Sequence, residues 1–398
     1  MSHSRSADVG DARALEIVHL AFEDHRQPGS GGGGHRTHEI NRRLAQRHRV
    51  TVVTAPYPGG RPRIEDGVHY RPLGLCLGHA GSLISYLVAL PFFVAFSPVC
   101  RRADLVVEDF AAPMSSMLVP LWTRRPTIAV VQWLFAREKS RRYHFPFYVF
   151  EELGIRLHTR FVAVSQYIGE LIAAAHPGAT VDVVLGGVTR PDTEVPEAEV
   201  TTGPMPGRVL YLGRLEWGPK GLDLLVDAFA RLSEDTDAHL TVVGDGRDEQ
   251  RLRDALARRG LAPRVEFAGR LTGADKWKAL GTAWVVVLTS RHESFGLVAA
   301  EALVAGTPVV AFDLPSLREI VVPGTGILVP PGDTAALGDA LRTVVNDPAR
   351  RAALATSAAQ VRSRFDWDAA ACAQEEAYIR AAGSLAPVRA TTAGGSRP

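Results

Sequence analysis

Cysteine and lysine are both scarce in this chain, and the scarcity of cysteine excludes a class of protein. The cysteines are far apart, odd in number and never arranged as C-x-x-C, which argues against a disulfide scaffold or a structural zinc site: Cys76, Cys100 and Cys372. This usage predicts a reducing compartment, the cytoplasm. Arginine carries most of the positive charge, because lysine occurs only at Lys139, Lys220, Lys276 and Lys278. We interpret that bias as genomic base composition.

The charge pattern also argues against a nucleic-acid-binding role. The formal net charge is only +2, so the chain has no general attraction to polyanions. No basic stripe with interleaved aromatic residues appears along the sequence, and such a stripe is typical of nucleic-acid-binding surfaces. We therefore do not expect a nucleic-acid partner.

Long hydrophobic runs are almost absent, and the N-terminus lacks the apolar core of a secretion signal. The exception is residues 83–99, LISYLVALPFFVAFSPV, which Arg101 and Arg102 follow. This run is short for a membrane span, and Pro91 interrupts it. We expect a kinked helix packed in the N-terminal domain. Contact with a membrane surface and a true membrane span stay as alternatives.

The length of 398 residues exceeds what one hydrophobic core usually supports, so we expect two domains. In both halves, short β-branched runs alternate with helical patterns, which predicts a doubly wound parallel α/β sheet in each. We place the N-terminal domain at 15–187 and the C-terminal domain at 208–365. The other expected segments are a linker, a C-terminal helix and two disordered tails: 188–207, 366–382, 1–14 and 383–398.

The most informative segment is residues 288–310, where Glu293 and Glu301 stand eight positions apart around a Ser-Phe-Gly step. We expect a helix over 295–305, ended by a glycine. Such a helix start attracts phosphate through its first amides, here those of Gly296, Leu297 and Val298. Glu293 can then accept hydrogen bonds from a sugar hydroxyl, and Glu301 from a ribose. An ordinary surface helix with two solvated glutamates is the alternative.

A second pattern lies upstream at 209–232, where an apolar strand, a glycine turn and an amphipathic helix follow one another. Arg214 and Lys220 flank the turn. A pair of cations there would stabilise the charge that builds on a diphosphate as it leaves. Two solvated loop cations are the alternative.

Together these segments resemble the retaining glycosyltransferases of family 4, whose E-x7-E signature matches Glu293 and Glu301. The resemblance covers about residues 15–382. It implies the GT-B fold, an α/β architecture of two Rossmann-like, doubly wound domains facing across a cleft, with the C-terminal helix crossing back to the N-terminal domain. It also implies a nucleotide-diphosphate sugar as co-substrate, with a UDP-sugar as first choice, and no metal or other cofactor. The turn before Lys220 departs from the family by being one residue longer.

The resemblance assigns roles by position. Arg214, Lys220 and Glu293 are expected to be catalytic, through the diphosphate and the transferred sugar. The residues expected to bind the donor are Gly32, Gly33, Gly244, Arg270, Ser294, Phe295, Gly296, Leu297, Val298 and Glu301. From the residues alone, the glycine run at 29–34, before a helix expected to begin near His35, also fits a flexible connector. A tight turn without a ligand accounts for Gly244 equally well.

On the acceptor side, Gln132 stands where the family often has a histidine beside the transferred sugar. Glutamine cannot carry a proton, but in the proposed front-face mechanism the leaving phosphate takes the acceptor proton itself. Glu108 and Asp109 end a strand, and paired carboxylates facing the cleft would suit a polyol or an aminated acceptor. Arg137 lies in a basic loop, which would suit a phosphorylated or lipid-linked acceptor at a membrane or is simply solvated.

Three functions remain after these observations. The leading hypothesis is a retaining transferase that moves a hexose-type sugar to a hydroxyl of a small polar acceptor, a polyol or an aminocyclitol-like compound. The runner-up is a peripheral-membrane transferase for lipid-linked or envelope glycans, which the apolar run and the basic loop would support. The third, motivated by Gln132, is a catalytically silent protein that binds sugar nucleotides.

Overall fold

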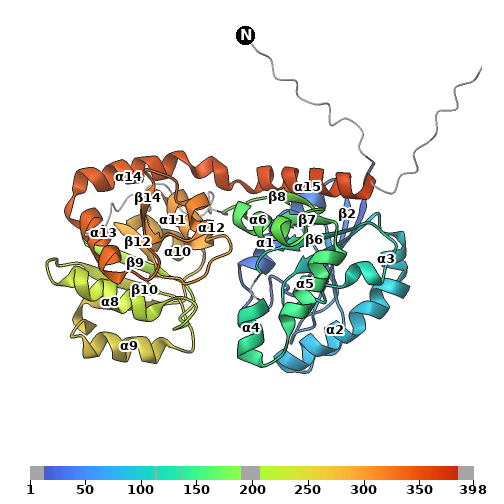
Figure 1. Ribbon diagram of the computed structural model, residues 1–398, viewed down its shortest axis with the longest axis horizontal. Helices are drawn as coiled ribbons and strands as arrows, with labels where there is room; N and C mark the ends of the chain where they lie inside the picture. The colour runs from blue at the N-terminus through green and yellow to red at the C-terminus, as the bar shows by residue number, and fades with distance from the viewer. Residues whose placement is uncertain (1–12, 113, 135, 190–206, 384–398) are drawn as a thin grey trace, which may run out of the picture. The chain divides into compact units, whose positions relative to one another are not determined.

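The structure is a computed structural model that describes residues 13–112, 114–134, 136–189 and 207–383. Contacts divide these residues into two compact units, labelled by their helices and strands in Figure 1. Unit 1 contains residues 13–162, 172–182 and 371–383, and unit 2 contains residues 163–171 and 183–370. The chain therefore passes between the units more than once. The predicted tails and most of the predicted linker at 188–207 lie outside the described residues.

The first sheet has eight strands in the order β3-β4-β2-β1-β5-β6-β7-β8. Neighbours from β4 to β6 pair in parallel, as the β-branched runs predict. At the edge, β3 pairs antiparallel with β4, a hairpin that the sequence analysis missed. Its turn is Asp66-Gly67, both at positive φ, a pair that favours two-residue hairpins. The strands are β1 (Glu16–Leu20), β2 (Arg49–Thr54), β3 (Arg63–Glu65), β4 (Val68–Pro72), β5 (Leu105–Phe110), β6 (Thr127–Val131), β7 (Arg160–Ala163) and β8 (Thr180–Val183).

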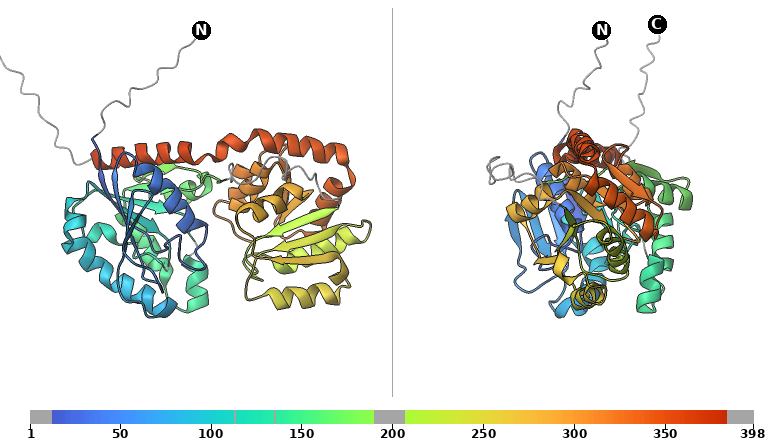
Figure 2. Two further views of the ribbon diagram at one scale, coloured as in Figure 1. Left: turned by 180° about the vertical axis from the view of Figure 1, so that it is seen from behind. Right: turned by 90° about the vertical axis from the view of Figure 1, so that its left-hand side faces the viewer.

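Helices cover both sides of this sheet, with α1 and α2 on opposite sides (Figures 1 and 2). Helix α1 begins at Gly32, three residues before the predicted start at His35, because the last glycines of the run adopt helical backbone angles. The helices of this half of the chain are α1 (Gly32–Leu44), α2 (Gly78–Phe96), α3 (Pro98–Arg102), α4 (Ala136–Tyr143), α5 (Phe147–Leu157) and α6 (Gln166–Ala175), with a short turn η1 (Val119–Leu121).

Helix α2 is the apolar run of the sequence analysis, and only one of its faces is packed. Its buried face joins a core with residues of β1, β2 and β5, through Tyr86, Leu90, Phe93 and Val94. The opposite side chains are 62–64% exposed: Ile84, Val88, Phe92 and Phe96. The prediction of a helix packed in the domain is therefore correct for one face and wrong for the other. Among the described helices, α2 alone is long and apolar enough to cross a membrane, which is weak evidence by itself.

The second sheet has six strands in the order β11-β10-β9-β12-β13-β14, and all of its pairs are parallel. The alternation of short β-branched runs and helical patterns predicted for this half of the chain is confirmed. The strands are β9 (Arg208–Leu212), β10 (His239–Val243), β11 (Val265–Gly269), β12 (Val285–Leu288), β13 (Val309–Phe312) and β14 (Gly326–Val329). The helices are α8 (Leu222–Ser233), α9 (Glu249–Arg258), α10 (Gly273–Thr282), α11 (Leu297–Ala305), α12 (Pro315–Ile320), α13 (Thr334–Asn346) and α14 (Pro348–Gln360), with turns η2 (Ala262–Arg264) and η3 (Arg362–Phe365).

Two hydrophobic cores lie on the two faces of this second sheet. One contains side chains of α8, α9 and α13, and the other contains side chains of α10, α11 and α12. Along β12 the side chains alternate between the cores, with Val285 and Val287 in the first and Val286 and Leu288 in the second. A strand buried on both faces has this pattern, because successive side chains point to opposite sides. The sheet is therefore doubly wound, as predicted.

The last helix, α15 (Trp367–Gly383), contributes its first turn to unit 2 and the remainder to unit 1. Polar groups anchor it in unit 1. Gln374 accepts a hydrogen bond from the buried Arg36 guanidinium at 2.8 Å, and Glu375 pairs with Arg47 and with His48. Hydrogen bonds between buried polar groups fix the register of a helix more strictly than apolar contacts alone.

Candidate functional site

Helix α11 of unit 2 begins at a left-handed glycine and has no side-chain cap. Gly296 is the N-cap residue with φ of 90°, and Gly306 ends the helix with φ of 83°. The helix starts at Leu297, two residues after the predicted start, because the left-handed backbone at Gly296 cannot be part of it. The Phe295 ring lies edge-on to Phe365 and within contact of Gly186, so this side chain packs in unit 2. The free amides of the first turn remain at the carboxyl end of β12.

Glu293, just before this helix, pairs with Lys220 of the β9–α8 loop. The Lys220 Nζ atom lies 2.6 Å from Glu293 Oε1, and the Ser290 hydroxyl donates to the same oxygen at 2.8 Å. The Lys220 carbonyl in turn accepts a hydrogen bond from the Thr289 hydroxyl at 2.9 Å. Two of the three residues predicted to be catalytic thus meet where the neighbouring strands β9 and β12 end.

A glycine makes this meeting of loops possible. Gly221 precedes α8 with φ of 61°, and a Cβ added there would lie 2.0 Å from the Thr289 carbonyl oxygen. Any side chain at this position would push the two loops apart and with them Lys220 and Glu293. The glycine after Lys220 is therefore required by the close approach of the β9 and β12 loops.

Arg214 lies in the same group, around the phenol of Tyr211. The Tyr211 hydroxyl donates to the Arg214 carbonyl at 3.1 Å. Burial raises the pKa of Tyr211, the charges of Glu293 and Glu216 raise it further, and the Arg214 charge opposes them. The Arg214 side chain is 72% exposed and 3.4 Å from Glu216, so its guanidinium is available to an anion. Arg214, Lys220 and Glu293 thus all lie in the loops that follow β9 and β12, at the carboxyl ends of these strands.

Glu301, one turn inside α11, is buried and paired with a lysine that the sequence analysis passed over. Lys276 Nζ on α10 lies 2.8 Å from Glu301 Oε1. Two of the four lysines therefore pair with the two glutamates of the E-x7-E signature. In a chain that uses arginine almost everywhere else, this rarity was the signal for Lys276.

Gly244 and Arg270 lie at the ends of the next two strands, β10 and β11. A Cβ added to Gly244 would lie 1.9 Å from the Gly213 carbonyl oxygen, and its φ is 139°. The close packing of the β9 and β10 loops therefore accounts for Gly244 without a ligand, which was the alternative interpretation. Arg270 is exposed in the loop after β11. Their roles in donor binding remain predictions.

In unit 1 the predicted carboxylate pair is separated, and the assignment of Glu108 is wrong. Glu108 is 1% exposed, and one of its oxygens accepts hydrogen bonds from the Ser115 hydroxyl, the Ser116 hydroxyl and the Met117 amide at 2.6–2.8 Å. Its other oxygen lies 3.3 Å from the buried His158 ring. A carboxylate occupied in this way holds the 115–117 loop and cannot face an acceptor.

Asp109 points to the other side of the sheet and is the centre of a polar group. The Thr37 hydroxyl of α1 donates to it at 3.0 Å, and the His19 ring lies 3.1 Å away. The Gln132 amide nitrogen lies 3.4 Å from the same Asp109 oxygen that His19 approaches. A Cβ added to Gly33 would lie 3.1 Å from Gln132 Oε1, so Gly33 leaves room for this amide.

The structure therefore brings together Asp109, Gln132 and the Gly32-Gly33 start of α1, all predicted, and adds His19 and Thr37, which were not. A histidine within the apolar β1 run EIVHL was the available signal for His19. Arg137 is placed elsewhere. Its side chain is 79% exposed on α4 and pairs with Glu152 of α5 at 2.9 Å. It therefore belongs to a solvated helix pair, as the alternative interpretation proposed.

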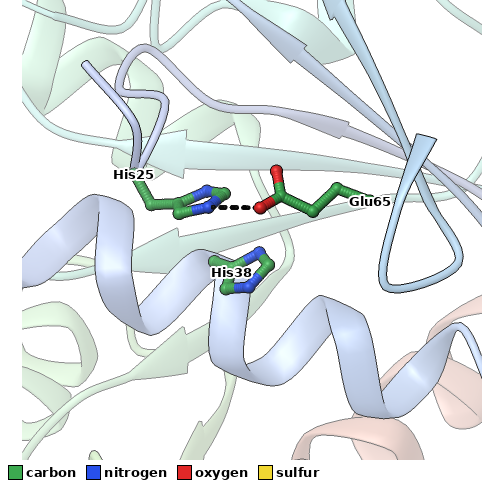
Figure 3. Close-up of side chains that lie close together, drawn as sticks. All are labelled: His25, His38 and Glu65. Carbon is green, nitrogen blue, oxygen red and sulfur yellow. Dashed lines mark hydrogen bonds and ion pairs between the residues drawn. The ribbon is translucent and has the colours of Figure 1, made fainter. Parts of the chain in front are cut away.

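One cluster in unit 1 has the residue types of a metal site, His25, His38 and Glu65, with ligand atoms within 4.8 Å of one another (Figure 3). The two rings are stacked with centroids 3.8 Å apart, so their nitrogen lone pairs run side by side and do not converge. Glu65 already pairs with Arg26 and Arg63, and the His38 Nδ1 atom lies 2.7 Å from the Tyr70 hydroxyl. Burial lowers the pKa of His38 to about 4. Contacts within the protein account for this cluster.

Two family models match the chain, and together they cover both units. The model for glycosyl transferases group 1 matches residues 197–361, and the model for glycosyltransferase family 4 matches residues 30–190. The chain belongs to this glycosyltransferase family. The first match contains Arg214, Lys220, Glu293 and Glu301, and the second contains Asp109 and Gln132.

Curated relatives of this glycosyltransferase align over about half of their own length or less. A phosphatidyl-myo-inositol mannosyltransferase of Mycobacterium leprae is 42% identical over 167 residues, 41% of this chain and 44% of the relative. A glycogen synthase of Mycobacterium tuberculosis is 35% identical over 209 residues, 52% of this chain and 50% of the relative. A D-inositol 3-phosphate glycosyltransferase of Xylanimonas cellulosilytica is 40% identical over 181 residues, 44% and 42% of the two chains.

Solved structures match over nearly the whole chain and confirm the GT-B fold. Sucrose-phosphate synthase from Thermosynechococcus elongatus has a TM-score of 0.73 at 21% identity, covering 92% of this chain and 98% of its own. HepE of Anabaena, solved with UDP and glucose, has a TM-score of 0.69 at 20% identity, covering 91% and 98%. At such identities the likeness shows the fold alone.

The buried Glu108 generates a prediction about stability and pH. Burial raises the pKa of Glu108, but His158 and the Ser115 and Ser116 hydroxyls lower it more, so that the pKa lies below its usual value. Its contribution to stability is present above the unfolded-state pKa of about 4.3 and is lost as the pH falls through the lower folded-state pKa. We expect Glu108→Gln to reduce the free energy of unfolding at neutral pH by about 1–3 kcal/mol. This difference should shrink in acid.

Denaturant unfolding of both proteins, followed from neutral pH into acid, checks this prediction. If the curves of free energy against pH for the variant and the wild type stay parallel below the unfolded-state pKa, Glu108 is not held ionised by its neighbours.

Proposed function

We propose that this chain transfers a hexose-type sugar from a nucleotide-diphosphate sugar to a hydroxyl of a polyol acceptor, with retention of configuration at the anomeric carbon. The observation that carries the proposal is the Lys220–Glu293 pair at the uncapped start of α11. A diphosphate bound there would meet the positive end of the helix dipole, with Lys220 and Arg214 beside it. Lys220 would exchange Glu293 for phosphate oxygens, and Glu293 would then accept a hydrogen bond from a sugar hydroxyl.

In the proposed reaction, the bond between the anomeric carbon and the phosphate oxygen breaks, and a bond from the acceptor oxygen forms on the same face. The acceptor proton passes to the departing phosphate, so no side chain has to carry it. Negative charge grows on the phosphate, where Lys220, Arg214 and the α11 amides stabilise it more strongly than in the ground state. These groups supply the positive charge that the step requires, and the proposal therefore includes no metal.

For the donor we propose a UDP-sugar. Glu301 would accept hydrogen bonds from ribose hydroxyls, with Lys276 holding the carboxylate in place. The loops that follow β10 and β11, with Gly244 and Arg270, are the proposed border of the base. HepE, a protein of the same fold, was solved with UDP and with UDP-glucose, which supports uracil as the first base to test.

For the acceptor we propose a cyclitol-type polyol. Since Glu108 is occupied within unit 1, Asp109 and Gln132 are the polar groups left to hold acceptor hydroxyls. Two of the three relatives described above carry inositol in their names, one as phosphatidyl-myo-inositol and one as D-inositol 3-phosphate. A lipid-linked acceptor is the second candidate, and the outward apolar face of α2 favours it.

Transfer assays with a panel of sugar nucleotides test the proposal, with myo-inositol, an inositol phosphate and phosphatidylinositol vesicles as acceptors. We expect a product with a cyclitol head group, and product with the vesicles alone would select the second candidate. If donor binds but neither an acceptor nor water is ever glycosylated, and Gln132→His restores transfer, the wild-type chain is a silent binder and the proposal is wrong.

Removing the Lys220 amine should affect turnover far more than affinity for the donor. We expect Lys220→Ala and Glu293→Ala each to lower kcat by about two to four orders of magnitude, for a loss of roughly 3–5 kcal/mol of transition-state stabilisation. Lys278→Ala is the matched control, because that lysine is exposed on α10. Steady-state kinetics of all three variants check the assignment. Turnover at the wild-type level in Lys220→Ala would place the diphosphate elsewhere.

Glu301 should affect donor affinity in the absence of any acceptor. A donor at a hundred times its Kd stabilises the protein by about 2.7 kcal/mol, which a thermal-shift assay detects. We expect Glu301→Ala to weaken donor binding by about ten- to hundredfold, because hydrogen bonds from the ribose to a carboxylate are lost. Each shift is measured against the same variant without ligand, and Glu234→Ala, an exposed glutamate at the end of α8, is the control. An unchanged shift in Glu301→Ala would contradict the ribose assignment.

A further inference from the structure

The outward face of α2 carries a row of large apolar side chains that the proposed reaction does not use. Ile84, Val88, Phe92 and Phe96 follow one another at intervals of four residues, and each is 62–64% exposed. Residues four apart lie on one side of a helix, so this row extends about 18 Å along α2. Soluble proteins rarely expose a continuous apolar surface of this kind without a partner for it.

Two leucines of the preceding loop extend the row. Leu75 and Leu77 are 65% and 62% exposed, although hydrogen bonds tie their backbone to α2. The Leu75 amide donates to the Ser85 hydroxyl at 2.8 Å, and the Leu77 amide donates to the Ser82 hydroxyl at 3.2 Å. Because the loop is fixed against the helix, the two leucines belong to the same surface. We call the six side chains the α2 apolar face.

The segment that contains the α2 apolar face carries formal charges of one sign. Residues 67–103 contain no aspartate or glutamate, whereas Arg71, Arg101 and Arg102 lie in this stretch and are exposed. The exposed Arg125 side chain donates to the Arg101 carbonyl, which brings a further cation to the same end of the helix. An apolar helix face whose own stretch of chain carries cations and no carboxylates is complementary to a bilayer with anionic head groups.

We propose that the α2 apolar face is a membrane-docking surface, on which unit 1 lies against an anionic lipid bilayer with α2 parallel to the membrane plane. The four side chains and the two leucines would enter the boundary between head groups and acyl chains, and the arginines would pair with lipid phosphates. The inference does not depend on the identity of the acceptor, since a docked enzyme can use a soluble or a lipid-linked one.

The buried side of α2 argues against a membrane span. Tyr86, Leu90 and Phe93 belong to the core that contains Val18 and Val106 of the sheet. If α2 crossed the bilayer, these side chains would leave the sheet and expose its core to water, at a cost that the helix alone does not recover. The charge pattern argues against a second copy of the chain as the partner. A symmetric contact through this face would bring the same cations together.

Co-sedimentation of the full chain with vesicles tests the proposal. We expect binding to phosphatidylcholine vesicles that contain phosphatidylglycerol and much weaker binding to phosphatidylcholine alone. The double variant Val88→Ser/Phe92→Ser should lose about tenfold or more of the affinity, and Arg101→Gln/Arg102→Gln should lose about fivefold for each arginine. Leu171→Ser is the control, because Leu171 is 37% exposed on α6, outside the α2 apolar face and its arginines.

Each outcome decides the proposal. The proposal is overturned if the wild type binds neither kind of vesicle, or if Val88→Ser/Phe92→Ser binds as strongly as the wild type. It is also overturned if bound protein resists extraction by alkaline carbonate, because that result indicates a helix that spans the membrane. The proposal is also overturned if the wild type is a dimer and this double variant is a monomer, because the α2 apolar face would then be a dimer interface. Transfer to a soluble acceptor without vesicles should stay at the wild-type rate in these variants. Failure of that assay in the wild type would count against the proposed reaction and leave the docking result unaffected.

Discussion

The contact between Lys220 and Glu293 is the interaction on which the arrangement of the donor side depends. Its two residues come from loops 73 positions apart, and they meet because β9 and β12 are neighbours in a parallel sheet. Parallel strands bring the loops at their carboxyl ends to one edge, which is why such sheets bind ligands there. Gly221 allows the two loops to lie close together, and the uncapped first turn of α11 follows Glu293. Without a donor, the cation and the carboxylate pair with each other. In the proposed complex a diphosphate would replace the carboxylate at Lys220, and Glu293 would keep the hydrogen bond from the Ser290 hydroxyl and gain one from the sugar.

Lysine rather than arginine at this contact has a physical reason. An ammonium group is a compact charge with three donors on a flexible stem, and it can move from a carboxylate to a phosphate by rotating a few bonds. A guanidinium fork prefers a planar two-point contact and would hold the glutamate more rigidly. The same choice recurs at Lys276 and Glu301. In an arginine-rich chain, the rarity of lysine could therefore have singled out Lys276 as well as Lys220.

Much of the fold could be predicted because the central strands of the second sheet, such as β12 and β13, are buried on both faces and consist of unbroken apolar runs. The helix of the E-x7-E segment could also be predicted, because a glycine lies at each end of α11. The prediction that Glu108 and Asp109 together face one acceptor was wrong. They are adjacent on β5, and adjacent strand residues point to opposite faces, so both could never have faced one ligand. The partners of Glu108, from Ser115 to His158, come from later in the chain, and only the folded structure brings them to it. The β3–β4 hairpin was missed for a different reason, because its strands are short and polar.

The corrected picture of unit 1 changes what that unit is expected to contribute. Asp109, the other carboxylate of the predicted pair, is hydrogen-bonded to Thr37 and lies close to His19 and Gln132, so it holds these side chains in place as much as it could bind a hydroxyl. Gln132 has an amide side chain, which cannot carry a proton. In the proposed reaction, unit 2 would supply the cations that stabilise the leaving phosphate, and unit 1 would select and place the acceptor. If unit 1 is held on the surface from which the acceptor comes, the local concentration of acceptor around the enzyme rises without any new contact at the site. An apolar face on α2, opposite to the packed side of that helix, would supply such confinement at no cost to the polar group around Asp109.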